Sequence, residues 1–433
     1  MRWLSIAIRR NLRPGVSVKE VLSWACFDFA NSGFSTVVIT AVFSAYFVSV
    51  IAEGTPWATL LWTLALSVSY VMIMLSAPVL GVFADVRRSK KKCLIFTTLG
   101  CCFFTGLLSL VKEGDIAMSI LFIILANFFF GTGENLIAAF LPELAKGRSI
   151  GKVSGWGWAI GYLGGLLTLV ICLAYLISGL FENAGVSGTM VITAVIFLIA
   201  SLPTFWLLKE RGVEKKGLKP SFFSGLKILK ISISKLSKFP DLKNFLYCLL
   251  IYQAGVQAVI TLAAVYADQA MRFSTTDTIV LILVVNITAC FGALIFGQIE
   301  DRIGHKNTLF LTLLGWLLTV LVAYASIDRT VFWIAANLAG FCLGASQSAG
   351  RAIVAFFSPK NREGEFLGLW GLAVKGSSIL GPMSYGLVVW LTNGNHRQAI
   401  LSLIIYFLLG MVILSRIDVN RGRQLATEVK KNS

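Results

Sequence analysis

The chain has 433 residues, of which 57% are apolar and only 14% are charged, and its mean hydropathy is +0.80. Soluble domains carry about 25% charged residues, so this composition excludes an ordinary soluble protein and predicts one that crosses a bilayer several times. The formal net charge of +17 would suit a nucleic-acid ligand, but the basic residues lie in connections between apolar runs, which excludes that class.

Apolar runs long enough to cross a bilayer as a helix, about 20 residues, occur twelve times. The expected spans are residues 21–50, 58–84, 93–111, 116–141, 152–178, 188–208, 243–271, 277–300, 307–325, 330–357, 364–391 and 397–417. All but six of the 38 Lys and Arg residues lie in the termini and in every second connection. By the positive-inside rule, both termini and the middle connection are therefore expected in the cytoplasm, beside anionic lipid head groups.

The middle connection divides the chain into two predicted halves. Residues 209–242 are the longest hydrophilic segment, and apolar positions within it, among them Phe222 and Leu226, recur at helical spacing. This pattern is typical of an amphipathic helix on a membrane surface. We expect a six-helix bundle over residues 1–208, a basic cytoplasmic linker over 209–242, and a second six-helix bundle with a cytoplasmic tail over 243–433.

An internal repeat supports this division. Aligning Pro142 with Pro359, which lie about half the chain apart, also aligns Glu134 with Arg351. Both charges lie inside apolar runs, where ionisable groups are costly and usually functional. The sequence thus predicts an all-α membrane protein with two pseudo-symmetric bundles that carry opposite charges at equivalent places.

Further polar residues lie inside the spans. In the first span, Asp28 and Asn31 recur at helical spacing and begin a polar stripe, although Asp28 could instead cap a short turn before the span. Residues expected to bind the substrate or a proton, or to gate, are Asp28, Asn31, Glu134, Gln253, Gln257, Gln347, Arg351 and Lys375. At 1.5 Å per helical residue, Asp28, Glu134 and Arg351 each lie about 10 Å deep, so they form one layer that suits an inner gate. The alternative, that these charges only pair with one another, stays open.

Aromatic residues of the fifth and eleventh spans are candidates for lining a substrate path. They are Trp156, Trp158, Tyr162 and Trp370. Ordinary packing is the alternative for them. The glycines of the fifth span, in SGWGWAIGYLGG, would let a neighbouring helix approach closely.

Two cytoplasmic connections, GVFADVRRSKKK and GQIEDRIGHKN, share a motif. The motif resembles the signature of the major facilitator superfamily, G-x-x-x-D-R-x-G-R/K-R/K. Its residues are Gly81, Asp85, Arg87 and Arg88 in the first copy and Gly297, Asp301, Arg302, Gly304 and Lys306 in the second. The first copy has Val86 where Arg is usual, and it lacks the inner Gly.

Five further stretches resemble the vacuole effluxer family of that superfamily: FDFANSGF, AAFLPELA, SGWGWAIGYLGG, GASQSAGR and EFLGLWGLAVKGSSILGP. This resemblance spans both halves and implies the twelve-helix fold of the superfamily. It also implies amino-acid transport, because the family includes fungal vacuolar proteins implicated in exporting amino acids. The short tails and loops favour a bacterial inner-membrane member.

The function expected is secondary active transport by alternating access, moving a small polar solute such as an amino acid outward. A zwitterion would fit acids in one half and bases in the other, and a proton is the candidate coupling ion. Alternatives are a lipid or drug-like solute translocator on the same fold and a sensor that does not transport. An enzyme, a cofactor and a metal are not expected, because the two His lie in separate loops and no nucleotide-binding or nucleophile motif occurs. A monomer in a bilayer is expected.

Overall fold

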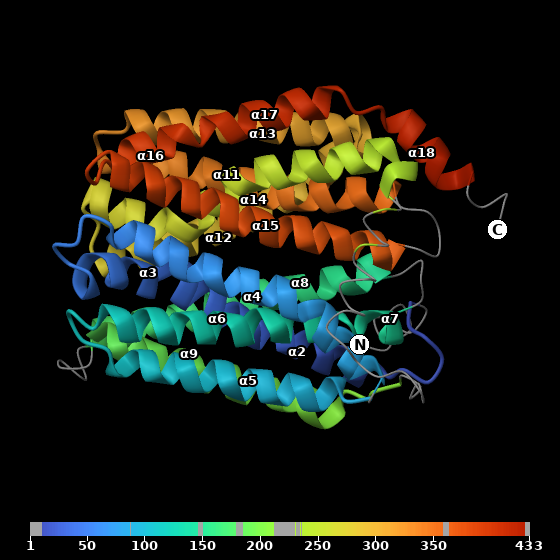
Figure 1. Ribbon diagram of the computed structural model, residues 1–433, viewed down its shortest axis with the longest axis horizontal. Coiled ribbons are helices and arrows are strands. Elements are labelled where there is room, and N and C mark those ends of the chain that lie inside the picture. Colours follow the sequence, from blue (N-terminus) through green and yellow to red (C-terminus); the bar gives the residue numbers. More distant parts are fainter. Residues whose placement is uncertain are drawn as a thin grey trace. The chain divides into compact units, whose positions relative to one another are not determined.

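The computed structural model describes residues 11–86, 88–145, 150–178, 185–211, 230, 234, 236–357 and 363–428, and most of them are helical (Figure 1). Among these residues, eleven helices are long and apolar enough to cross a membrane. A further long helix, α14 (Arg329–Phe357), lies where the tenth span was expected. The predicted all-α membrane fold is therefore confirmed.

The chain forms two compact units, of which the first comprises Met1–Tyr46 and Val68–Ile228. Its helices are α2 (Val18–Phe34), η1 (Ser35–Ala41), α3 (Phe43–Tyr46), the later part of α4 (Ala58–Val86), α5 (Lys90–Leu107), η3 (Leu108–Leu110), α6 (Ile116–Ala138), α7 (Leu141–Leu144), α8 (Ile150–Ser178) and α9 (Gly185–Leu207). The helix α2 is central, because α6, α8 and α9 all pack on it. It begins at an N-cap, Ser17, whose hydroxyl accepts a hydrogen bond from the Glu20 backbone N at 3.2 Å.

The second unit comprises Phe47–Ser67 and Leu229–Ser433. Its helices are η2 (Phe47–Ile51), the start of α4, η5 (Leu236–Lys238), α11 (Pro240–Met271), α12 (Thr275–Ile303), α13 (His305–Ala325), α14, α15 (Glu363–Leu391), α16 (His396–Ser402), α17 (Ile404–Ser415) and α18 (Val419–Glu428). Here α11 is central and packs against α14, α15 and α17. The start of α4 packs on α15, where a Cβ at Gly386 would lie 2.5 Å from Thr63 Oγ1.

The predicted boundaries of the bundles and linker stay a prediction. The amphipathic helix expected around Phe222 and Leu226 lies outside the described residues.

Each central helix has one crossing that only glycine permits. A Cβ on Gly164 of α8 would collide with the Phe29 carbonyl of α2, and a Cβ on Gly381 of α15 would collide with the Ala254 carbonyl of α11. The alignment that matches Pro142 with Pro359 also matches these two glycines. The internal repeat thus includes a tight helix contact, as the glycine-rich fifth span predicted.

Candidate functional site

The polar stripe of α2 lies between the faces that contact α6 and α8. Toward α6, Trp24 donates a hydrogen bond to the Ile137 carbonyl at 2.9 Å. Toward α8, the Asp28 carboxylate lies where a Cβ on Gly157 would be. With 100° between successive residues, Asn31 falls on the same side of α2 as Asp28. Asp28 therefore lies inside the helix and does not cap a turn before it.

Glu134 is half-buried in α6, beside residues that contact α4. On the same face, Asn127 donates a hydrogen bond to Ser69 of α4 at 2.5 Å, and a Cβ on Gly131 would meet the Ile73 side chain of α4. This stripe of small and polar residues is thus partly a close helix contact. Glu134 is the ionisable residue on that face.

The two glutamines of α11 lie between the faces that contact α14 and α15. Residues on the occupied faces are Cys248 and Gly255 toward α17, Leu249 and Tyr252 toward α14, and Leu250 and Ala254 toward α15. Gln253 follows Tyr252 by 100° and Gln257 lies one turn later. The Gln253 side chain is buried, and its Nε2 has no hydrogen-bond partner among the described residues. This amide is a donor that a bound polar solute would satisfy.

A buried hydroxyl one residue before Gln253 was not predicted from the sequence. Tyr252 is fully buried, and its hydroxyl lies where a Cβ on Gly350 of α14 would be. Over the part of the chain that the structure describes, this hydroxyl has no hydrogen-bond partner. The only signal was its position next to Gln253 in the seventh span.

The remaining polar candidates lie in α14 and α15. Gln347 is half-buried in α14, and Arg351 lies one turn later in the same helix. Lys375 and Trp370 are half-buried in α15. Helical spacing puts Lys375 on the side of α15 that carries Gly386.

The aromatic candidates of α8 do not share one face. The rings of Trp158 and Tyr162 lie 6.2 Å apart between centroids. Trp156 precedes Trp158 by two residues, so it lies about 200° away around the helix. The alignment that matches Gly164 with Gly381 pairs Trp158 with Lys375. A path lined by Trp158 would therefore not include Trp156.

The two motif connections are mostly helical. Gly81 and Asp85 lie in the last turns of α4, while Gly297, Asp301 and Arg302 lie in those of α12. Arg87 lies outside the described residues.

The turn of the second copy is made by Gly304, at φ +83, and in the first copy Arg88 takes the equivalent place at φ +48. The first turn therefore forms without the inner glycine, at a cost of roughly 1 kcal/mol. Lys306 donates to the Ile417 carbonyl at 2.6 Å, beyond the end of α17.

Two units of long apolar helices, each with polar residues inside a central helix, have the architecture of a multi-pass membrane transporter of the major facilitator superfamily. A D-xylose-proton symporter shares this fold with a TM-score of 0.71 and 14% identity, covering 93% of this chain and 98% of that one. The D323A mutant of the nucleoside transporter NupG gives a TM-score of 0.70 and 15% identity, covering 92% of this chain and 99% of that one.

The family model described as "Vacuole effluxer Atg22 like" matches residues 57–427, and the chain belongs to this family. The uncharacterized MFS-type transporter YxiO of Bacillus subtilis (strain 168) is 27% identical over 409 residues, which are 92% of this chain and 94% of that protein. Autophagy-related protein 22 of Saccharomyces cerevisiae (strain ATCC 204508 / S288c) is 20% identical over 432 residues, which are 88% of this chain and 81% of that protein. The protein is thus a transporter of this family and not an enzyme.

Proposed function

We infer that the protein transports amino acids or related zwitterions, in the efflux direction and coupled to protons. The observation that carries this proposal is the polarity of the intramembrane charges: Asp28 and Glu134 are acids in the first unit, while Arg351 and Lys375 are bases in the second. An acid binds the ammonium group of the substrate, and an Arg binds its carboxylate through a two-pronged hydrogen bond.

Proton coupling is assigned to the acids. A carboxylate inside a membrane helix can take up and release a proton, and such residues form proton relays in transporters. Asp28 lies beside two glycines of α8, Gly157 and Gly161, so its carboxyl group has room there that a larger side chain would fill. Protonation of Asp28 or Glu134 would remove one negative charge from the site in each cycle.

Purified protein in lipid vesicles is expected to transport at least one member of a radiolabelled amino-acid panel, faster when a pH gradient is imposed. In Asp28→Asn or Glu134→Gln, the flux should lose its response to the gradient, because the group that carries the proton is gone. Glu113→Gln is the matched control, since Glu113 is an exposed acid in the turn before α6 and should keep the wild-type response. No flux or binding across the panel would refute the substrate class, and an unchanged pH response in both variants would refute the proton role.

We also propose a bacterial inner-membrane location, with cytoplasmic termini, anionic lipids at the cytoplasmic face and a monomeric protein. In a cysteine-free background, Glu113→Cys should react with a membrane-impermeant maleimide in intact cells, whereas Asn420→Cys of α18 should react only after permeabilisation. Glu113 is chosen because its neighbour Gly114 has φ +84, where another residue would be strained. Labelling in the reverse order would contradict this orientation.

A further inference from the structure

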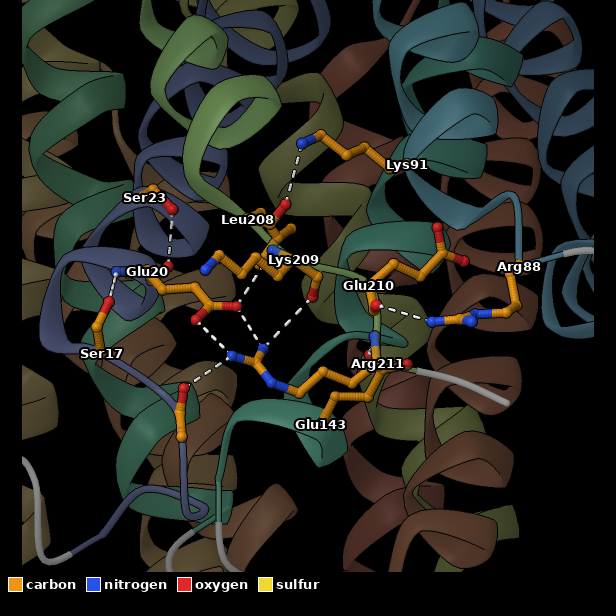
Figure 2. Close-up of polar contacts among 11 residues, drawn as sticks. Ser17, Glu20, Ser23, Arg88, Lys91, Glu143, Leu208, Lys209, Glu210 and Arg211 are labelled. Atoms are coloured by element: carbon orange, nitrogen blue, oxygen red, sulfur yellow. Dashed lines mark hydrogen bonds and ion pairs between the residues drawn. The ribbon is translucent and has the colours of Figure 1, made fainter. Parts of the chain in front are cut away.

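An ion pair fastens the start of α2 to the residues that follow α9 (Figure 2). Glu20, in the first turn of α2, is 3% exposed. Both oxygens of its carboxylate accept from the Arg211 guanidinium, with 2.7 Å between Oε2 and Nη2. The Lys209 backbone N also donates to Glu20 Oε1 at 3.1 Å, and Arg211 Nη2 donates to the Gly15 carbonyl at 3.2 Å. The hydrogen bond to Glu20 raises the pKa of Arg211.

Two neighbouring helices hold the same short segment, residues 208–211. Glu143 of α7 accepts from Lys90 Nζ of α5 at 2.8 Å and from the Arg211 backbone N at 2.9 Å. Lys91 of α5 donates to the Leu208 carbonyl at 3.0 Å, just beyond the last residue of α9. Figure 2 shows Lys91 beside the Leu208 carbonyl and the Arg211 guanidinium beside the Glu20 carboxylate. We call the contacts that Glu20, Lys91 and Glu143 make with residues 208–211, together with the Lys90–Glu143 pair, the first clasp.

The second unit has the same arrangement, which we call the second clasp. Asp241, in the first turn of α11, is fully buried. Its Oδ2 accepts from Arg421 Nε at 2.6 Å and its Oδ1 accepts from Nη2 at 2.7 Å. The backbone N of Asp418 also donates to Asp241 Oδ1, at 3.0 Å. Lys306, at the start of α13, donates to the Ile417 carbonyl at 2.6 Å.

The two clasps share three kinds of contact, and the Glu143 contacts of the first clasp lie outside this match. In each, an acid in the first turn of the central helix binds a backbone N–H and an Arg that follow the last span of the unit. In each, a Lys at the start of a third helix binds a carbonyl at the end of that span. Helix starts favour acids, and the last carbonyls of a helix lack partners within the helix. Both units thus provide partners for the backbone N–H and carbonyl groups at the end of their last span, although the residues that do so differ.

We propose that the clasps stay closed throughout the transport cycle and fasten the sixth span to the first and the twelfth to the seventh, so that each unit moves as one body. The burial of the two acids is the argument. The side chains of Arg211 and Arg421 are 27% and 55% exposed, but those of Glu20 and Asp241 are only 4% and 0% exposed. Separating either pair would leave the charge of its buried acid uncompensated away from water, so such a pair is unsuited to a gate that opens in every cycle. The acids here also accept from the backbone, and these bonds would be lost as well. This inference rests on the transport function proposed above.

Cross-linking distinguishes a permanent clasp from a gate. In a cysteine-free background, Glu20→Cys with Arg211→Cys removes the ion pair, and a short bifunctional thiol reagent then joins the two positions. Amino-acid flux should fall about tenfold in the reduced double variant and return after cross-linking. Asp241→Cys with Arg421→Cys should behave in the same way. Flux that is abolished by cross-linking, or unchanged in the reduced variant, would overturn the proposal.

An exposed ion pair serves as the control. Arg329 and Asp277 lie 3.5 Å apart with side chains 56% and 45% exposed, and Asp277→Asn should leave flux unchanged because exposed pairs contribute little.

A second measurement needs no substrate and separates failure of the clasp from failure of the transport proposal. In the wild-type protein, the backbone amides of Lys209 and Asp418 should exchange hydrogen as slowly as amides in the middle of α2, because they open only when the unit unfolds. Glu20→Gln should accelerate exchange at Lys209 and not at Asp418, and Asp241→Asn the reverse. Fast exchange of both amides in the wild-type protein would show clasps that open, and would overturn the proposal even if no panel member is transported.

Discussion

Valine at Gly164 is expected to remove most of the folded protein from the membrane. A Cβ at this position would collide with the Phe29 carbonyl, and a backbone group cannot rotate away as a side chain can. Overpacking in a close-packed interior costs about 1–3 kcal/mol, and here α2 and α8 would have to separate along their crossing. Gly381→Val should do the same in the second unit, where the Ala254 carbonyl is in the way.

The measurement is the yield and melting temperature of each variant, followed by size-exclusion chromatography of a fluorescent fusion. Gly106→Val is the matched control, because Gly106 lies in α5 and a Cβ there would meet no atom of a neighbouring element within 4 Å. It introduces the same side chain into a helix without the collision. If Gly164→Val melts at the temperature of Gly106→Val, the crossing is looser than the structure indicates.

The spans and the glycine crossings could be predicted from the sequence because both depend on local signals. A run of about 20 apolar residues is sufficient to identify a membrane helix, and small residues at helical spacing identify a close crossing. Whether a span is an α-helix or a π-helix at a given turn leaves no such signal in the sequence. The first span continues from α2 through the π-helices Ser35–Ala41 and Phe47–Ile51, and nothing in its apolar composition distinguishes these from α-helix.

The clasps were missed for a different reason. Charge counting assigns Lys and Arg to one side of the membrane but says nothing about their partners. Ser17 and Glu20 have the spacing of a capping box, in which Glu20 would bind the N-cap backbone. In the structure the Glu20 carboxylate instead binds Arg211, which lies far along the chain. Pairings over such separations follow from the tertiary fold and cannot be read from the local sequence.

The sequence identified the candidate residues of the site but not the contacts that their side chains make. Helical spacing predicts that Asp28 and Asn31 lie on one side of the first span, and both residues do lie within one helix, α2. The same rule shows that Trp156 and Trp158 point apart. The absence of a hydrogen-bond partner for Gln253 within the described residues depends on how α11 packs, which no pattern in the sequence reports.

Replacing Gln253 with methionine is expected to lower amino-acid flux about tenfold without lowering the melting temperature. An unsatisfied buried polar group costs about 1–3 kcal/mol, so an apolar side chain of similar length should leave the unit as stable as before or more so. If the amide donates to the transported solute, its loss weakens binding, and a tenfold change corresponds to about 1.4 kcal/mol. A lower flux together with an unchanged or higher melting temperature would identify Gln253 as a residue that serves binding and not stability.

Thr204→Val is the control for this prediction. Thr204 of α9 is buried, and its hydroxyl donates to the Ser23 carbonyl of α2 at 2.6 Å. Its replacement removes a satisfied hydrogen bond, so the melting temperature should fall while the flux per folded molecule stays unchanged. If Gln253→Met gives this same result, a lower melting temperature with normal flux, then Gln253 serves the packing of α11 and is no part of the binding site.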